Sequence, residues 1–449
     1  MRVLLFTGKG GVGKTTTSAA TAVHAALRGH KTLVLSTDPA HSLADALGVR
    51  LGDEPTEIGD GSVGGLYGQQ VDTQRAFEQS WREVSHYLRD LLEQGGVDPI
   101  EAEELTVLPG AEEILALLEL RAQVDSGRWD VVVVDCAPTA ETLRLLALPE
   151  ALSWWTQRVF APERRMSRAL RPVLSHLVGV PLPPDRVFTA VERLQGELGE
   201  VRRLLTDPVT SSVRLVLTPE AVVVAEARRT LTSLALHGYR VDGVVANRVF
   251  TDDGDPWRAG WAAAQATQLD TIAQSFTGVP LWRAAYQPGE PVGLSALAAF
   301  SEDLYAAAAS PLPTRPGTPN DSRPGTAKDS RSGRASPPSA GPAPAAADYA
   351  AAELSGAADP LAVATTPEPM SVERVATDEF VLSVALPLAD KRDVDLVRKG
   401  DELVLTVGSH RRVLALPAVL RRCVVDGAAL RDGRLRVRFR PDPDLWMRS

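Results

Sequence analysis

The segment GKGGVGKTTT, from Gly8 to Thr17, matches the phosphate-loop pattern G-x-x-x-x-G-K-[ST]. Glycines in such a loop let backbone N–H groups surround phosphate oxygens, and the first turn of the following helix adds partial positive charge. The apolar run RVLLFT precedes the segment, and helical composition from Ser18 to His30 follows it. This strand–loop–helix order is the context that the motif requires. It favours a nucleotide site over the alternative, an accidental glycine-rich turn.

The residues of this loop have separate expected roles in binding ATP and Mg²⁺. Lys14 is expected to reach the β- and γ-phosphates, and the Thr15 hydroxyl is expected to lie on Mg²⁺. Lys9 is a second lysine that the pattern does not require, and it is a further candidate catalytic residue. The other loop residues predicted to bind the nucleotide are Gly8, Gly10, Gly11, Val12, Gly13 and Thr16.

Two carboxylates are predicted at the same edge of the sheet as the loop. Asp38 lies in STDPAHSL, at the end of a β-rich run, where it could orient a water for attack on the γ-phosphate or cap a helix. Asp135 ends the run DVVVVD, which is the Walker B arrangement of a carboxylate that supports Mg²⁺. We therefore predict that Thr15, Asp38 and Asp135 surround Mg²⁺.

Short β-rich runs alternate with helical segments through the first 308 residues. The runs KTLVLSTD, WDVVVVD, VRLVLTP and VDGVVAN are nearly continuous in apolar residues, which is typical of parallel strands buried on both faces. The sequence therefore predicts an α/β domain over residues 1–308, with a doubly wound, mostly parallel sheet. Two mostly helical inserts are expected within it, at about 72–124 and 151–206.

Apolar residues in the second insert recur at intervals of three and four from Val191 to Leu205. This spacing predicts an amphipathic helix. The apolar face of such a helix either packs on its own domain or forms one wall of a groove for a partner. Periodicity alone favours the first alternative.

The composition changes after the predicted ATPase domain. Residues 309–370 are rich in Pro, Ser, Gly and Ala, and such a segment cannot bury enough apolar surface to offset its conformational entropy. They are predicted to be a disordered linker. Residues 371–449 contain period-two runs such as RLRVRFR, separated by turn signals, and are predicted to form a small antiparallel β-sandwich.

Overall composition excludes several classes of protein. The formal net charge is −9, which gives no electrostatic footprint for nucleic acid. The only cysteines, Cys136 and Cys423, are too few for a disulfide framework or a zinc site built from several cysteines. The first residues become glycine-rich too early for a signal peptide, and no apolar run reaches the ~20 residues of a membrane span. The sequence therefore predicts a cytoplasmic protein.

Three motifs together resemble one family. GKGGVGKTT, STDPAHSLADAL and DCAPTAETLRLL are similar to motifs of the arsenical-pump ATPases and of the related ATPases that target tail-anchored membrane proteins, within the deviant Walker A class. The resemblance covers about residues 1–308. It implies that Asp38 orients the attacking water, that Asp135 is the switch-two aspartate near Mg²⁺, and that Asn247 in VVANRV contacts adenine.

The resemblance also implies a role for Lys9. In this class the extra lysine is a signature residue, which each of two facing ATPase units inserts towards the phosphates of the other. Lys9 would then neutralise transition-state charge as an arginine finger does. Because the chain has one phosphate loop, the resemblance implies a homodimer, or a heterodimer with a related ATPase.

The sequence also departs from the family. Neither cysteine lies in the cluster that binds arsenite in the pumps, and WRAGW (Trp257–Trp261) stands near the place of the zinc clasp of the targeting ATPases, so no zinc is expected. The chain has four methionines, whereas methionine-rich helices hold the client in the targeting ATPases. The segment after the linker resembles the small heat-shock protein (α-crystallin) domain.

Three functions stay open. The first is an ATPase whose cycle switches a helical surface that binds a hydrophobic client protein or a membrane partner. The second is an ATP-regulated holdase in which the β domain is the working surface. The third is the energising subunit of an arsenite efflux pump, against which the cysteine content argues.

Overall fold

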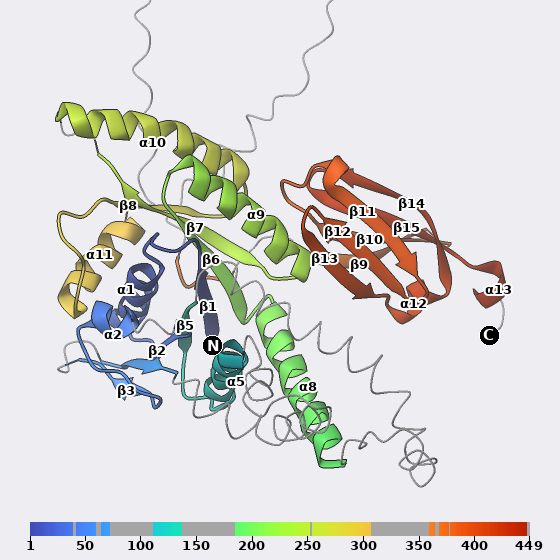
Figure 1. Cartoon of the computed structure of the whole chain (residues 1–449), viewed down its shortest axis with the longest axis horizontal. Coiled ribbons are helices and arrows are strands. Elements are labelled where there is room, and N and C mark those ends of the chain that lie inside the picture. The colour runs from blue at the N-terminus through green and yellow to red at the C-terminus, as the bar shows by residue number, and fades with distance from the viewer. Residues whose placement is uncertain are drawn as a thin grey trace, which may run out of the picture.

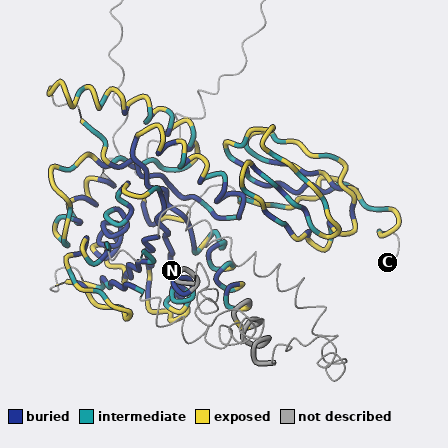
Figure 2. Tube along the Cα trace, in the orientation of Figure 1, coloured by how far each residue is buried: buried dark blue, intermediate teal, exposed yellow. Residues whose placement is uncertain are grey.

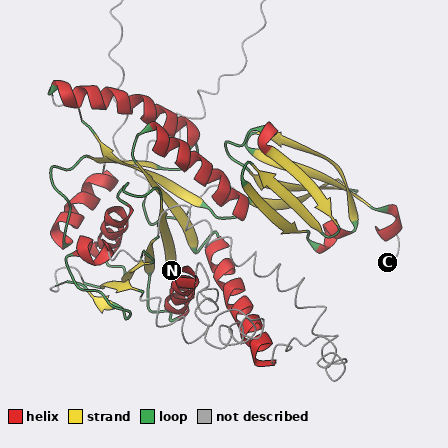
Figure 3. Ribbon diagram, in the orientation of Figure 1, coloured by secondary structure: helices red, strands yellow, loops and turns green. Residues whose placement is uncertain are grey.

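The computed structural model describes residues 1–38, 42–59, 64–71, 111–136, 185–251, 254–306, 359–363, 368–376 and 378–446. The chain beyond Asp38 in the first switch, the second switch after Cys136, and most of both predicted helical inserts lie outside these residues. The described residues form an α/β domain and a separate β domain beside it (Figures 1 and 3).

A mixed eight-stranded sheet in the described residues is the centre of the α/β domain. Its strand order is β3-β4-β2-β5-β1-β6-β7-β8, and every neighbouring pair is parallel except β3 and β4. The strands are β1 (Arg2–Thr7), β2 (Thr32–Ser36), β3 (Thr56–Glu57), β4 (Leu66–Gln70), β5 (Val131–Asp135), β6 (Ser211–Leu217), β7 (Val241–Val249) and β8 (Leu281–Ala285). This confirms the predicted doubly wound, mostly parallel fold.

Helices cover both faces of this sheet. On one face lie α1 (Lys14–Leu27), α2 (Ser42–Leu47) and α11 (Leu294–Ala306), which pack on one another (Figure 1). On the other lie α5 (Ala111–Asp125), α8 (Asp185–Thr206), α9 (Ala221–His237) and α10 (Pro256–Ser275). Among the described helices, none is both long enough and apolar enough to span a bilayer.

The core lies between the sheet and these two layers (Figure 2). All of β1 and β5 is buried, as the apolar runs predicted. In α1, small side chains such as Ala19 and Ala22 are fully buried, because the helix approaches the sheet closely. The predicted amphipathic helix is α8, and its Leu198, Val201 and Leu205 are buried against its own domain. For these three residues the packing alternative is therefore correct.

The C-terminal domain is a sandwich of two antiparallel sheets, as predicted. One sheet has the order β14-β15-β10-β9 and the other β11-β12-β13. The strands are β9 (Met370–Ala376), β10 (Glu379–Ala385), β11 (Val394–Lys399), β12 (Glu402–Val407), β13 (His410–Ala415), β14 (Cys423–Arg431) and β15 (Arg434–Pro441). In β15, Leu435, Val437 and Phe439 face the core, while the alternating arginines lie outside it.

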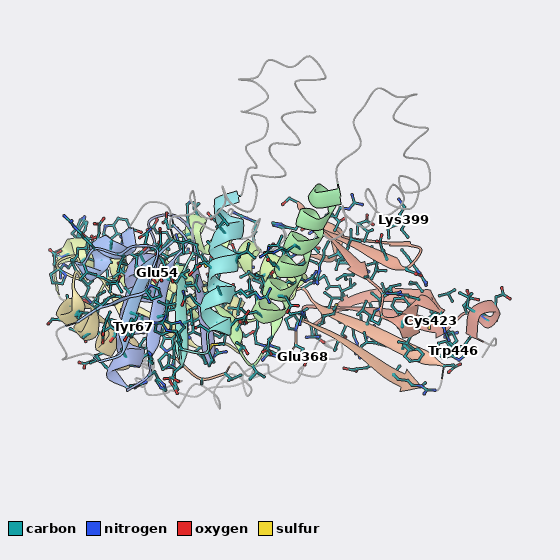
Figure 4. All side chains as sticks on the ribbon, turned by 90° about the horizontal axis from the view of Figure 1, so that it is seen from below. Glu54, Tyr67, Glu368, Lys399, Cys423 and Trp446 are labelled. Carbon is teal, nitrogen blue, oxygen red and sulfur yellow. The ribbon has the colours of Figure 1, made fainter. Side chains whose placement is uncertain are left out.

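Two short helices complete this sandwich: α12 (Ala418–Arg421), and α13 (Pro443–Trp446) at the end of the described chain. Trp446 packs against Phe380 of β10, with ring centroids 5.8 Å apart. Cys423 is buried near this end of the domain (Figure 4), whereas Cys136 follows β5 in the ATPase domain. The two thiols therefore belong to different domains.

The sandwich contacts the ATPase domain through α9. Leu236 near the end of α9 is fully buried in the apolar core of the sandwich, and the Thr232 hydroxyl donates to the carbonyl of Pro387. The buried guanidinium of Arg412 donates to the carbonyl of Leu236. A cation at this position is favourable because the last carbonyls of a helix carry partial negative charge. The β domain thus packs on the C-terminal end of α9 and forms hydrogen bonds with it.

Candidate nucleotide site

The phosphate loop connects β1 to α1 at the carboxyl edge of the sheet, and two of its glycines have no room for a side chain. A Cβ added at Gly8 would lie 2.1 Å from the carbonyl oxygen of Val216, in β6. Gly13 has φ 90°, and an added Cβ there would lie 2.3 Å from Nδ2 of Asn247. Only glycine fits these two positions, because the loop passes directly against β6 and β7.

We expect Gly13→Ala to weaken ATP binding by at least about tenfold, because the strained backbone and the displaced Asn247 would deform the loop. Calorimetric titration with ATP measures the change. The matched control is Gly260→Ala on α10, where an added Cβ meets nothing within 4 Å and φ is not left-handed. Equal affinity in the two variants would contradict the requirement for glycine at position 13.

Lys14 and Thr15 open α1, with their functional atoms at the loop. Lys14 is 7% exposed, and its Nζ donates to the carbonyl of Lys9 over 3.4 Å. The helix has no side-chain N-cap, so its first-turn N–H groups are left to face an anion. The Thr15 Oγ1 lies 3.2 Å from Oγ of Ser42, the first residue of α2. The ammonium predicted to bind phosphate and the hydroxyl predicted to bind Mg²⁺ thus belong to neighbouring residues in the first turn of α1.

Asp135 ends β5 and is completely buried. Neither of its carboxylate oxygens has a hydrogen-bond partner among the described residues at bonding geometry, although the Thr15 and Ser18 hydroxyls are near enough to act on it. Burial raises the pKa of this carboxyl to about 7; Thr15, Lys14 and Ser18 oppose the shift, and the charge of Asp38 adds to it.

These properties fit a divalent cation. A buried carboxylate beside the Thr15 hydroxyl, with neither oxygen bonded within the described part of the chain, has the oxygen chemistry that Mg²⁺ prefers. Among the described residues there is no group of three or more His, Cys, Asp or Glu side chains that could hold a metal. An ion here would therefore depend on phosphate oxygens as further ligands, which is typical of Mg²⁺ bound with a nucleotide.

Asp38 lies just beyond β2, beside Asp135. Ser36 of β2 is paired in register with Asp135 of β5, which brings the ends of the two strands together. The backbone N–H of Asp38 donates to Oγ of Ser36 over 3.2 Å, and its carbonyl accepts from Nε2 of Gln70 over 2.9 Å. The structure thus brings the two predicted carboxylates to one edge of the sheet, and the role of Asp38 towards water stays a prediction.

Lys9 lies beside α9 of its own chain. Its Nζ is 3.6 Å from Oε2 of Glu226, and the two side chains are 41% and 30% exposed. An exposed pair of this kind contributes only about 0–1 kcal/mol, so it holds the lysine weakly. The predicted reach of Lys9 into a second ATPase unit is a property of an assembly, which a single chain does not test.

Asn247 lies near the end of β7 and contacts the phosphate loop. Its Nδ2 donates to the carbonyl of Val12 over 2.9 Å, and its Oδ1 accepts from the N–H of Arg248, which has φ 56°. Gln265 of α10 holds this bend, since it donates to the carbonyl of Arg248 and accepts from the N–H of Phe250. Asn247 therefore links β7 to the loop, and its contact with adenine stays a prediction.

Three residues of the site were not predicted as site residues. Ser42 lies inside the quoted motif STDPAHSL, so its hydroxyl near Thr15 had a signal in the sequence. Glu226 and Gln70 had none, because their contacts with Lys9 and Asp38 depend on how α9 and β4 pack beside the loop.

Comparison with known proteins gives matches over both domains. The family described as anion-transporting ATPase matches residues 1–306, and one described as an HSP20-like domain found in ArsA matches residues 377–439. A putative arsenical pump-driving ATPase of Chlorobaculum tepidum is 32% identical over 98% of this chain and 96% of its own length. An uncharacterized protein of Streptomyces coelicolor is 37% identical over 100% of both chains. An ATPase ASNA1 homolog of Cryptosporidium parvum is 32% identical over 54% of this chain and 63% of its own.

These matches confirm the resemblance drawn from the three motifs and the small heat-shock-like character of the C-terminal domain. They also confirm the predicted ATP hydrolase at the level of the family, whose members are described as ATPases. The roles of individual residues stay predictions. Because the match runs through the phosphate loop, both carboxylates and Asn247, the chain belongs to the anion-transporting ATPase family, with an HSP20-like domain after its ATPase domain.

Proposed function

We propose that the chain is a Mg²⁺-dependent ATPase that works as a dimer and converts ATP hydrolysis into movement of a helical surface that binds a client or partner. The observation that carries this proposal is the state of Asp135. A buried carboxylate whose two oxygens have no hydrogen-bond partner at bonding geometry among the described residues lies beside Thr15 and the phosphate loop. Such a group is costly to bury unless a cation compensates it.

Each residue has one task in this proposal. The N–H groups at the start of α1 and the Lys14 ammonium bind the phosphates, while Thr15 and Asp135 hold Mg²⁺. The ion, when bound with ATP, screens the charge of the phosphates. Asp38 orients a water towards the γ-phosphate. Lys9 leaves Glu226 and neutralises charge on the phosphates bound by the facing protomer.

The test measures ATP hydrolysis across a range of protein concentrations, with the mass determined by light scattering on the same samples. For the wild type we expect specific activity to rise as the dimer forms. Asp38→Asn is expected to form an ATP-bound dimer while hydrolysis falls at least about a hundredfold, because binding is kept and the water loses its orienting group. Turnover by a strict monomer at a constant specific rate would refute the dimeric mechanism.

A second candidate function is an ATP-regulated holdase, which the HSP20-like match over residues 377–439 favours. It predicts that the full chain suppresses aggregation of a model client, and that ATP changes this suppression. The ATPase proposal alone predicts no such effect on an unrelated client.

The name of the Chlorobaculum relative raises the question of an arsenical pump. Cys136 is buried, and burial raises the pKa of its thiol to about 12, which disfavours the thiolate that binds metals. Cys423 is buried in the other domain. A pump-energising role would therefore have to recognise its effector without the cysteines, and it predicts hydrolysis that rises with arsenite.

A further inference from the structure

A cluster of buried charges is formed by Arg2 and Asp242, near the amino ends of β1 and β7, and by Arg214 in the middle of β6. The guanidinium of Arg214 is 1% exposed and donates to both carboxylate oxygens of Asp242, over 3.2 and 2.9 Å. It lies over the ring of Trp282 at 4.4 Å. Arg2 joins the cluster, because one of its terminal nitrogens lies 3.6 Å from the same carboxylate and donates to Ser212.

The cluster has two guanidinium groups and one carboxylate. A buried cation is costly unless its donors find acceptors, and one aspartate cannot supply enough of them. The other guanidinium N–H groups must therefore donate to uncharged acceptors. Two of these are backbone carbonyls that come from the far end of the predicted linker.

We call residues Asp359–Ala362 the docking turn. Arg214 donates to the carbonyl of Pro360 over 2.7 Å, and Arg2 donates to the carbonyl of Ala362 over 3.1 Å. The turn closes on itself, since the N–H of Ala362 donates to the carbonyl of Asp359 and the N–H of Leu361 to its carboxylate. The Leu361 side chain is 9% exposed and belongs to the apolar core of the ATPase domain.

Order at the docking turn differs from the prediction for this segment. Residues 309–370 were expected to be disordered because of their composition, but composition does not register a four-residue turn whose carbonyls meet buried arginines. Asp followed by Pro is a typical start of a β-turn. One leucine and two carbonyl contacts therefore hold a short segment inside a stretch with few large apolar residues.

The same guanidinium also contacts the helix that precedes the linker. Arg214 donates to the hydroxyl of Tyr305 over 3.2 Å, and Tyr305 is the second-last residue of α11. Tyr305 is buried too, with its hydroxyl hydrogen-bonded to Thr21 of α1. Arg214 therefore contacts the chain at two places, at Tyr305 and at Pro360. Residues 307–358 lie between the helix that contains Tyr305 and the docking turn.

We propose that the arginine cluster is a docking site for the turn Asp359–Ala362, and that this site attaches the HSP20-like domain to the ATPase domain without need of a continuous chain through residues 307–358. Only eight positions separate Ala362 from Met370, where β9 begins. Glu368, in this short connection, marks the side of the β domain that faces the ATPase domain (Figure 4). Docking therefore keeps the sandwich beside α9, where Leu236 and Arg412 make the second contact.

The test cuts the linker in the full-length protein. A protease recognition sequence replaces part of residues 320–340, and the chain is cleaved to completion and diluted from micromolar to nanomolar concentrations. Association of the two fragments is followed by light scattering and by anisotropy of a dye on the C-terminal fragment. We expect the cleaved wild type to keep the mass of the intact chain at micromolar concentration.

Two substitutions separate the docking turn from the α9 contact. Leu361→Lys places a cation in the apolar core of the ATPase domain and removes the buried side chain, so we expect fragment affinity to fall at least about a hundredfold. The matched control is Val363→Lys, two residues away, where the wild-type side chain is 44% exposed. The two fragments of cleaved Val363→Lys are expected to bind each other with the wild-type affinity.

The proposal is overturned if the cleaved wild type separates at micromolar concentration, or if Leu361→Lys and Val363→Lys bind equally well. Thermal unfolding of the uncleaved variants shows whether each one folds. If Leu361→Lys does not fold, Leu361→Ala decides instead, with an expected loss of about tenfold because only the buried side chain is removed. The outcome does not depend on ATP hydrolysis, so the proposed function and the docking site stand or fall separately.

Discussion

Replacing Lys9 with alanine is expected to leave ATP binding intact and to reduce hydrolysis by at least about a hundredfold. Binding should survive because the ammonium of Lys9 lies beside Glu226 on α9, and because the loop backbone and Lys14 are the groups proposed to contact the phosphates. Hydrolysis should fail because a cation that reaches the phosphates only in the assembled dimer acts on the transition state more than on the bound ATP. Calorimetric titration and steady-state turnover measure the two effects.

Mixing two inactive variants tests whether Lys9 acts across a dimer. Lys9→Ala keeps Asp38, and Asp38→Asn keeps Lys9, so a mixed dimer has one site with both groups only if the lysine comes from the partner. With random pairing, half of the dimers are mixed, and activity should return to about a quarter of the wild type. If the mixture stays inactive although mixed dimers form, Lys9 acts within its own chain or not at all.

The control for this experiment is Glu226→Gln. It removes the ion pair seen in the single chain but keeps the lysine. Because an exposed pair contributes little to stability, the variant should unfold at nearly the wild-type denaturant concentration and should hydrolyse ATP. Loss of hydrolysis in Glu226→Gln would mean that the carboxylate, and not only the cation, is required.

Asp135→Asn is the second change with a large expected effect, and it acts on stability and activity in opposite directions. Burial raises the folded-state pKa of Asp135 to about 7, whereas in an unfolded chain this group titrates at about 3.9. Between these values the folded state binds more protons than the unfolded state. The contribution of Asp135 to stability without nucleotide or Mg²⁺ therefore decreases as pH rises through this window.

Asparagine removes this dependence because it cannot ionise. At pH 8 the variant without nucleotide should be more stable than the wild type by an amount on the order of 4 kcal/mol, and the gain should vanish near pH 4. Hydrolysis should fall at least about a hundredfold, because a neutral amide does not replace the carboxylate beside Mg²⁺. Urea unfolding at several pH values and turnover with Mg²⁺-ATP measure both effects.

Asp130→Asn is the matched control, at the other end of the same strand. Asp130 is exposed, and its carboxylate accepts from the N–H of Lys31 over 2.9 Å. The substitution should leave hydrolysis unchanged and should not stabilise the protein at pH 8. An Asp135→Asn variant that is no more stable than the wild type at pH 8, or a difference in stability between the two that does not grow from pH 4 to pH 8, would contradict the burial argument.

Most of the fold could be predicted because its signals are local. The run RVLLFT before GKGGVGKTTT specifies a buried strand and a phosphate loop, and both form where expected. The alternation in RLRVRFR likewise places Leu435, Val437 and Phe439 in the core of the sandwich. The period of apolar residues follows from strand and helix geometry, so it can be read without knowing any neighbour.

The sequence by itself determined the fold class, the family and the residues proposed to bind a nucleotide. The tertiary structure alone decided three things: that Glu226 holds Lys9, that Asn247 binds the carbonyl of Val12, and that Arg214 meets both the helix before the linker and the docking turn. Each of these contacts joins residues that are more than 90 positions apart in the chain. Whether such residues come into contact depends on how the helices and strands pack on one another. No sequence period or motif reports which distant residues packing will bring together.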